Sequence, residues 1–161
     1  GCSTIRKIFS PIWVNGPIKK FVTENIVIVG DAAGQSKPTT AGGIFSCGMG
    51  GIMAGNAITK YLETNDLSQL QQYQKSWHNK FGKEFEKQIL ARKILSRINN
   101  ETIDKLFDMV TPDILSDISS KDDFDFHAAS IVKLLGLRKS LSTAQNIMGA
   151  EIKRLLSGQL H

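Results

Sequence analysis

Apolar and polar positions follow several distinct patterns along the chain, and each pattern predicts a different element. Residues 26–29 are apolar and β-branched, and they run directly into a glycine and an aspartate. Such a run is typical of a buried strand that ends at a ligand. Before it, residues 5–14 and 18–22 are largely apolar and flank Asn15-Gly16. Because Asn-Gly adopts the positive φ angles of a tight turn, these two segments are predicted to pair as a β-hairpin.

A glycine-rich helix is predicted after the strand. Residues 38–59 hold no charged side chain and contain six glycines, of which Gly48, Gly51 and Gly55 recur at spacings of three and four. These three glycines are expected on one face, where another backbone or a flat ligand can approach closely. The stretch is long enough for a membrane span, but its glycines leave too little hydrophobic area. A buried helix is therefore the favoured interpretation.

The rest of the chain has the spacing of helices. Apolar side chains three to four apart begin at Leu67 and predict one long amphipathic helix that runs to about Ile98. The stretch 64–66 is expected to cap its start. Further helices are predicted over 101–110, 112–118, 122–136 and from about 140 to 156. A helix as long as the first needs a partner surface, which we expect in a preceding part of the same protein.

Charge is concentrated in the long helix. The chain carries a formal net charge of +5, and residues 75–97 hold seven basic side chains against two acidic ones. Such an excess can face phosphate, a membrane surface or water, and the solvated face is the favoured interpretation. No aromatic stacking pattern or recognition motif accompanies these residues, so no nucleic-acid partner is expected.

Cysteine and histidine positions exclude two classes of site. Cys2 and Cys47 are the only cysteines, which gives neither a disulfide framework nor a metal-ligand spacing, and the histidines are isolated. No metal site is expected, and a reducing, cytoplasmic setting fits best. The chain starts at Gly1 without an initiator methionine or a signal peptide. We therefore expect an incomplete piece, from the C-terminal part of a larger domain.

The stretch around Gly30-Asp31 carries the candidate chemistry. A carboxylate at the end of a strand can accept hydrogen bonds from sugar-type hydroxyls. Gly42 and Gly43 lie at the start of the next helix, where free N–H groups and the helix dipole suit an electron-rich ligand edge. A hydroxyl contact and such a helix end, a dozen residues apart, suit a flavin with its ribityl chain.

These residues also support a family resemblance. The run GDAAGQSKPTTAGGIF over residues 30–45 resembles the second FAD motif of flavoproteins related to para-hydroxybenzoate hydroxylase, and most closely that of the geranylgeranyl reductase family. The turn Asn-Gly-Pro-Ile at residues 15–18 is similar to the one that precedes the motif in that family. Ala41 stands where the family usually has glycine.

The resemblance implies a set of contacts with FAD. Asp31 is expected to contact ribityl or pyrophosphate oxygens, and the N–H groups of residues 42–44 are expected to face flavin N1 and O2. The implied cofactor-binding residues are Gly30, Asp31, Ala32, Ala33, Gly34, Pro38, Gly42, Gly43 and Ile44. Two further residues remain open: Lys37 is either a cation near phosphate or reduced flavin or a solvent-facing lysine, and Cys47 is either a redox or substrate-positioning group or, as favoured, a small buried thiol.

The resemblance also implies the architecture. The expected fold is α/β leaning to mostly α, with a β-hairpin and a buried strand of an FAD/NAD(P)-binding fold followed by a C-terminal bundle of helices. Residues 1–62 are expected to be the C-terminal part of the FAD-binding domain, and residues 63–161 the helical region. The family's Gly-x-Gly-x-x-Gly fingerprint is absent from this chain. The adenine half of FAD thus has no visible site, and the chain alone is expected to be inactive.

The implied function of the parent protein is FAD-dependent reduction of isoprenoid (geranylgeranyl) double bonds in prenyl lipids by hydride transfer from reduced flavin. The electron donor is left open as NAD(P)H or another reductant, and no catalytic acid is identified. A prenyl-lipid substrate and peripheral membrane association through residues 75–97 are expected. Two alternatives are a flavin monooxygenase or electron-transfer dehydrogenase of the same superfamily and, from another class, a non-catalytic basic helical binding module.

Overall fold

The computed structural model describes residues 3, 5–108, 110–121, 125–127 and 130. Within them the fold is mostly helical, with one small antiparallel sheet. The elements are β1 (Val22–Thr23), β2 (Ile26–Val27), the 3-10 helix η1 (Gly30–Ala33), α1 (Ile44–Thr64), α2 (Ser68–Leu95), α3 (Asn100–Asp108) and α4 (Pro112–Lys121). The mostly helical part of the predicted fold class is thus confirmed, and the predicted helices after Lys121 lie outside the described residues.

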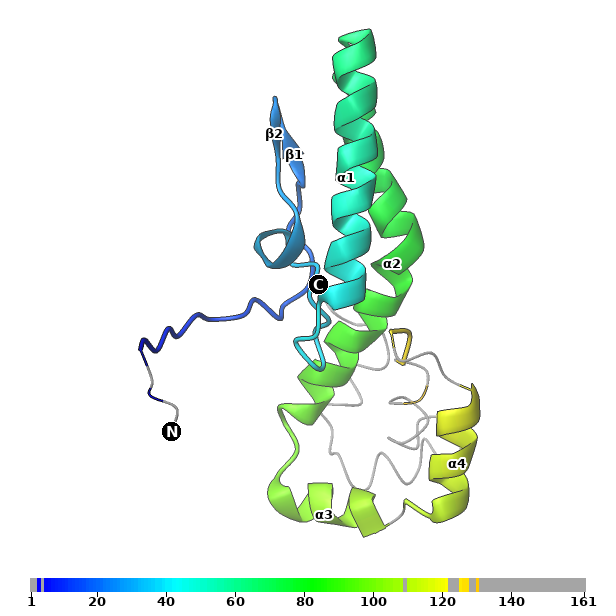
Figure 1. The fold of residues 1–161 in the computed structure, drawn as a ribbon. Coiled ribbons are helices and arrows are strands. Elements are labelled where there is room, and N and C mark those ends of the chain that lie inside the picture. Colours follow the sequence, from blue (N-terminus) through cyan, green and yellow to red (C-terminus); the bar gives the residue numbers. More distant parts are fainter. Residues whose placement is uncertain (1–2, 4, 109, 122–124, 128–129, 131–161) are drawn as a thin grey trace.

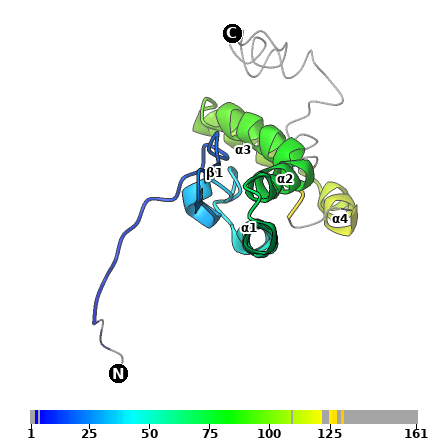
Figure 2. The same ribbon diagram turned by 90° about the horizontal axis from the view of Figure 1, so that it is seen from above.

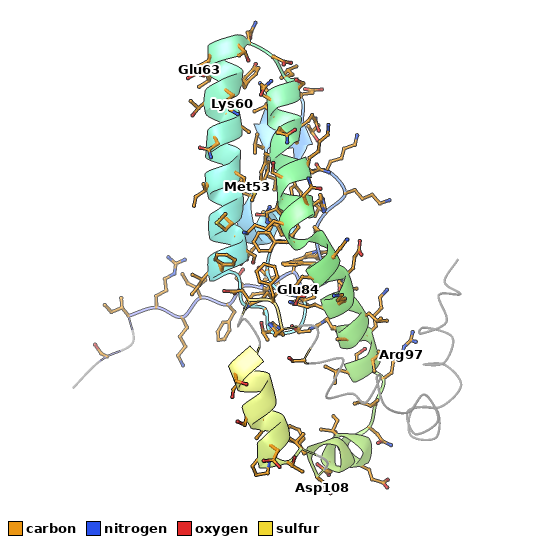
Figure 3. The ribbon with its side chains drawn as sticks, turned by 90° about the vertical axis from the view of Figure 1, so that its right-hand side faces the viewer. Met53, Lys60, Glu63, Glu84, Arg97 and Asp108 are labelled. Carbon is orange, nitrogen blue, oxygen red and sulfur yellow. The ribbon has the colours of Figure 1, made fainter. Side chains whose placement is uncertain are left out.

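Helices α1 and α2 form an antiparallel pair that dominates the molecule (Figure 1). Asn65 ends α1 in the left-handed conformation, with its N–H bonded to the Tyr61 carbonyl at 2.7 Å. Asp66 then caps the start of α2 by accepting the Ser68 N–H at 2.9 Å, as its sequence predicts. Because α2 is the longer helix, it continues past the beginning of α1, and Figure 3 shows Glu84 at that level and Arg97 near its far end.

Aromatic residues of α2 build the core between the two helices. The predicted spacing is confirmed, because Tyr73, Trp77 and Phe81 are all buried on one face of α2. Phe21 packs against this face, with its ring 5.5 Å from Tyr73 and 5.4 Å from Trp77. Small side chains of α1 cover the same rings; the buried positions are Ser46, Gly50, Ala54 and Ala57. Small residues opposite large rings let the two helices approach closely.

The prediction that Gly48, Gly51 and Gly55 form a close-contact face is wrong. Gly48, Gly51 and Gly55 are exposed, and a methyl group built on any of them meets no atom within 4 Å. Gly50 makes the close approach instead. None of the helices in the described part of the chain combines the length and apolarity needed to cross a membrane.

The predicted β-hairpin is wrong in its position. Among the described residues before Val22 no strand forms, and residues 5–14 run away from the helix pair as an extended arm (Figures 1 and 2). Gly16 has a positive φ of 87°, but its carbonyl accepts the Trp13 indole N–H at 2.7 Å, and Pro17 has no N–H to donate to a ladder. The observed hairpin instead pairs Val22 with Val27 and turns at residues 24–25.

The predicted buried strand at residues 26–29 is also wrong in part. Strand β2 covers Ile26–Val27, and one further hydrogen bond joins the Ile28 N–H to the Phe21 carbonyl at 2.8 Å. The Ile26 side chain is 59% exposed, and residues 27–29 are half-buried. A β-branched run is buried on both faces only when layers cover both faces of its sheet. Among the described residues, α2 is the layer that packs on this small sheet. These residues do not establish an FAD-binding fold.

Candidate functional site

The site begins where the chain leaves β2 and turns through η1. Gly30 and Gly34 both adopt left-handed backbone angles, with φ of 72° and 69°. They flank the turn, and the Gly34 N–H closes it by donating to the Asp31 carbonyl at 3.0 Å. Ala33 is buried and its carbonyl accepts the Ile18 N–H at 3.1 Å. The turn thereby leaves Asp31 and Ala32 exposed on the outer surface.

A buried glutamine braces the turn from inside. Gln35 Oε1 accepts the Gly30 N–H at 2.8 Å, and its Nε2 donates to the Tyr73 hydroxyl at 2.7 Å. That hydroxyl donates in turn to the Ile28 carbonyl at 2.9 Å. Burial raises the pKa of Tyr73 to about 12, so the hydroxyl keeps its proton at neutral pH. Sequence reasoning missed this network because Tyr73 is 38 residues from Gln35 and 45 residues from Ile28.

Three polar side chains meet at the start of α1. The Ser36 hydroxyl donates to Asp31 Oδ1, and the Cys47 thiol lies 3.7 Å from the same oxygen. Burial raises the pKa of the Cys47 thiol, and the Asp31 carboxylate adds to the rise. A thiol with a raised pKa is mostly protonated near neutral pH and is a weak nucleophile. The raised pKa argues against a redox role for Cys47, although its side chain is half-buried and not fully buried as predicted.

Backbone hydrogen bonds close the loop of residues 37–42, just before α1. The Lys37 N–H donates to the Gly42 carbonyl at 2.8 Å, and the Ala41 N–H returns to the Lys37 carbonyl at 2.9 Å. Pro38 is fully buried, and its carbonyl accepts from Arg92 of α2 at 3.1 Å. The solvent-facing interpretation of Lys37 is wrong: the side chain is buried, and Nζ pairs with Asp125 at 2.9 Å.

The start of α1 presents backbone donors beside Asp31. Gly43 is the N-cap residue, and within the described structure no side chain caps the helix. A methyl group built on Gly43 would lie 2.8 Å from Cys47 Sγ and 3.4 Å from Asp31 Oδ1. A larger residue at position 43 would therefore collide with Cys47, and the glycine lets the start of α1 lie close to the carboxylate. N–H donors with partial positive charge beside an exposed carboxylate suit a ligand with both an electron-rich edge and hydroxyls, and a flavin with its ribityl chain fits that description.

The predicted site residues thus separate into two groups. Asp31 and Gly43 come together, with Cys47 beside them, and Ile44 is 97% exposed at the same helix end. Gly30, Ala33, Gly34 and Pro38 shape the backbone behind this point. No group of three or more histidine, cysteine or acidic side chains suited to a metal occurs among the described residues.

Within residues 30–43, which we call the motif loop, Ala41 is the one non-glycine residue with a positive φ. Its φ is 58°, which costs a residue with a Cβ about 1–2 kcal/mol. We expect Ala41→Gly to stabilise the fold by about 0.5–1 kcal/mol, because glycine loses about 0.5–1 kcal/mol of extra chain entropy. Urea unfolding followed by circular dichroism measures the change. Ala32→Gly is the control, since Ala32 has no positive φ and should lose stability; the explanation is wrong if both variants lose it.

Comparison with known proteins points to one family. An uncharacterized protein of Methanocaldococcus jannaschii is 35% identical over 121 residues, which is 74% of this chain and 31% of that protein. Digeranylgeranylglycerophospholipid reductase 1 of Methanococcoides burtonii is 32% identical over 129 residues, 79% of this chain and 31% of that protein. The digeranylgeranylglycerophospholipid reductase of M. jannaschii is 37% identical over 95 residues, 58% of this chain and 24% of that protein. The chain is related to the geranylgeranyl reductase family.

This relationship confirms the resemblance to the geranylgeranyl reductase family. The chain spans less than a third of the length of these curated relatives. No protein-family model and no solved structure matches it. The relationship to the geranylgeranyl reductase family therefore rests on sequence similarity to these partial matches.

Proposed function

We propose that this chain supplies the flavin-contacting motif of an FAD-dependent oxidoreductase that reduces geranylgeranyl double bonds of prenyl lipids. The observation that carries the proposal is the exposed Asp31 carboxylate next to the uncapped start of α1, where a methyl group built on Gly43 would lie 3.4 Å from Asp31 Oδ1. Relatives that are named as reductases support the substrate class.

Each part of the motif has a distinct role in this proposal. Asp31 accepts hydrogen bonds from ribityl hydroxyls, while the N–H groups of residues 42–44 donate to the pyrimidine edge of the ring. When bound, the reduced flavin supplies the hydride for the double bond. Negative charge gathers at that edge on reduction, so donors and a helix dipole there favour the reduced form. Pro38 and the two left-handed glycines hold the backbone that positions these groups.

The remaining functions are assigned to other parts of the protein. The electron donor, NAD(P)H or another reductant, and the adenine half of FAD need residues beyond those of this motif. The lysines of α2 at positions 75, 80, 83 and 87 are at least partly exposed, as a solvated face or a contact with anionic lipid headgroups requires. We propose a cytoplasmic, peripheral placement with a prenyl-lipid substrate. A flavin monooxygenase or electron-transfer dehydrogenase is the alternative, and oxygen-dependent NAD(P)H consumption or reduction of a redox partner would identify it.

Replacing the carboxylate tests the proposed site. In Asp31→Asn the amide oxygen can still accept from Ser36, so the fold is preserved while the charge and one acceptor are lost. Because hydrogen bonds to charged groups contribute about 1.5–3 kcal/mol, we expect flavin affinity to fall about tenfold to hundredfold. Quenching of riboflavin and FAD fluorescence measures it.

The control for this test is Asp104→Asn, which removes an exposed carboxylate on α3 and should bind as the parent chain does. The proposal is contradicted if the unsubstituted chain, Asp31→Asn and Asp104→Asn bind flavin with equal affinity, or if the unsubstituted chain binds no flavin. The substrate class is tested separately, by incubating the full-length protein with reduced FAD and a geranylgeranyl lipid and measuring the gain in lipid mass.

A further inference from the structure

The motif loop is held by side chains from far along the sequence. Lys37 Nζ and Asp125 Oδ1 are 2.9 Å apart, and the two side chains are 5% and 26% exposed. Thr39 Oγ1 lies 2.9 Å from His127 Nε2, a second contact across 88 residues. These two contacts come from nearly consecutive positions, so one short segment meets the loop at two points.

Phe126, between those two positions, fixes the segment against the helices. Its ring stacks on Phe81 of α2 with centroids 5.7 Å apart and planes 6° apart. The same ring meets the edge of Phe45, in the first turn of α1, at 6.4 Å. We call Asp125, Phe126 and His127 the clamp. The clamp touches the loop, the start of α1 and the middle of α2 at once.

The other side of the loop is fixed to α2 directly. Arg92 donates to the Pro38 carbonyl, and Thr39 Oγ1 donates to Gln88 Oε1 at 3.1 Å. Lys37 transmits these constraints to the helix start, because its N–H is bonded to the Gly42 carbonyl. Its Cε also lies 3.1 Å from a methyl group built on Gly42, which leaves little room between them. The Lys37 side chain thus lies close to Gly42, one residue before the N-cap of α1.

We propose that Asp125 is a positioning residue of the candidate flavin site. It holds Lys37 beneath the motif loop, and Lys37 holds the donors of Gly42 and Gly43 in place. This inference rests on the proposed function, since the donors matter only if a ligand binds them. The inference gives Lys37 a role other than the contact with phosphate or reduced flavin that the sequence left open. The helical region thereby sets the affinity of a site whose contacting atoms lie in the motif.

Removing the Asp125 charge tests the inference in the full chain. Asp125→Asn should weaken riboflavin binding about tenfold, because affinity falls with the fraction of ordered loop. The same loss of order should remove most of the hydrogen–deuterium exchange protection of amides 39–46. Exchange along the middle of α2 should stay unchanged, which separates a local effect from general unfolding. Asp125→Glu should retain most of the affinity, and Asp104→Asn serves as the control.

Reversing the pair distinguishes positioning from direct contact. Lys37→Glu combined with Asp125→Lys should restore both slow exchange and riboflavin affinity to within about threefold of the parent chain, because the pair is re-formed with opposite polarity. Restored exchange with lost affinity overturns the inference, since Lys37 would then contact the ligand itself. Unchanged exchange in Asp125→Asn also overturns it. If the unsubstituted chain binds no flavin, the proposed function is wrong and the predicted loss of riboflavin affinity cannot occur. Hydrogen–deuterium exchange in Asp125→Asn still reports whether Asp125 orders the loop.

Discussion

Gly34→Ala is expected to destabilise the fold by about 2–5 kcal/mol and to disorder the turn that carries Asp31. A Cβ at this position would overlap the Gly16 carbonyl oxygen and lie 2.9 Å from the Gly16 carbonyl carbon and 3.0 Å from Pro17 Cα. All of these atoms belong to the backbone, so no side chain can swing away. Overpacking costs about 1–3 kcal/mol, and the φ of 69° adds about 1–2 kcal/mol.

Gly30→Ala is the matched control for Gly34→Ala. Gly30 has nearly the same φ, at 72°, but a Cβ there meets no atom within 4 Å. The control should therefore lose about 1–2 kcal/mol, from backbone strain alone. Guanidinium unfolding of both variants gives the difference. If the two variants lose equal stability, the close crossing of residue 34 over the Gly16 carbonyl is not what constrains this position.

Gly50→Ala is expected to cost about 2–6 kcal/mol, an effect comparable to that of Gly34→Ala. A methyl group there overlaps Gln35 Oε1 and lies 2.9 Å from Gln35 Cδ. A glutamine side chain can normally move, but this one is fully buried and bonded to both the Gly30 N–H and the Tyr73 hydroxyl. Displacing it combines overpacking, at about 1–3 kcal/mol, with unsatisfied buried groups at about 1–3 kcal/mol.

Gly51→Ala provides a control of opposite sign. The neighbouring glycine is exposed, and a methyl group built on it has open space around it. Alanine in an exposed helix interior is more stable than glycine by about 0.5–1 kcal/mol. Urea unfolding should therefore order the proteins as Gly51→Ala, parent chain, Gly50→Ala. A neutral Gly50→Ala would mean that Gln35 has another position with its hydrogen bonds satisfied.

The parts of the fold that the sequence predicted well depend on local periodicity. The aromatic positions of α2 follow a helical spacing, and the cap at Asp66 bonds within two residues of itself. Both are decided by neighbours in the chain. The motif around Asp31 was recognised for a similar reason, since its glycines, carboxylate and helix start are contiguous.

The failed predictions share a dependence on distant partners. The turn at Asn15-Gly16 matches a hairpin signal, but Gly16 is used to pass beneath Gly34 and is held by Trp13. The surroundings of Lys37 stayed open between two interpretations, because nothing near it in sequence reveals Asp125. Helix α1 carries glycines on two faces, and Gln35 packs against Gly50. A Cβ built on Gly48, Gly51 or Gly55 meets no atom within 4 Å in the described structure. Spacing identifies which residues share a face, but it does not identify which face is covered.

The contacts that complete the site join residues at very different separations along the chain, and this separation affects the order in which they form. The α1–α2 pair closes over a short connection, whereas Gln35 reaches Tyr73 across 38 residues and Lys37 reaches Asp125 across 88. The entropy lost on closing a loop grows with its length. We therefore expect the helical hairpin to form before the clamp engages. A ligand bound at the loop would stabilise the state in which the clamp is engaged.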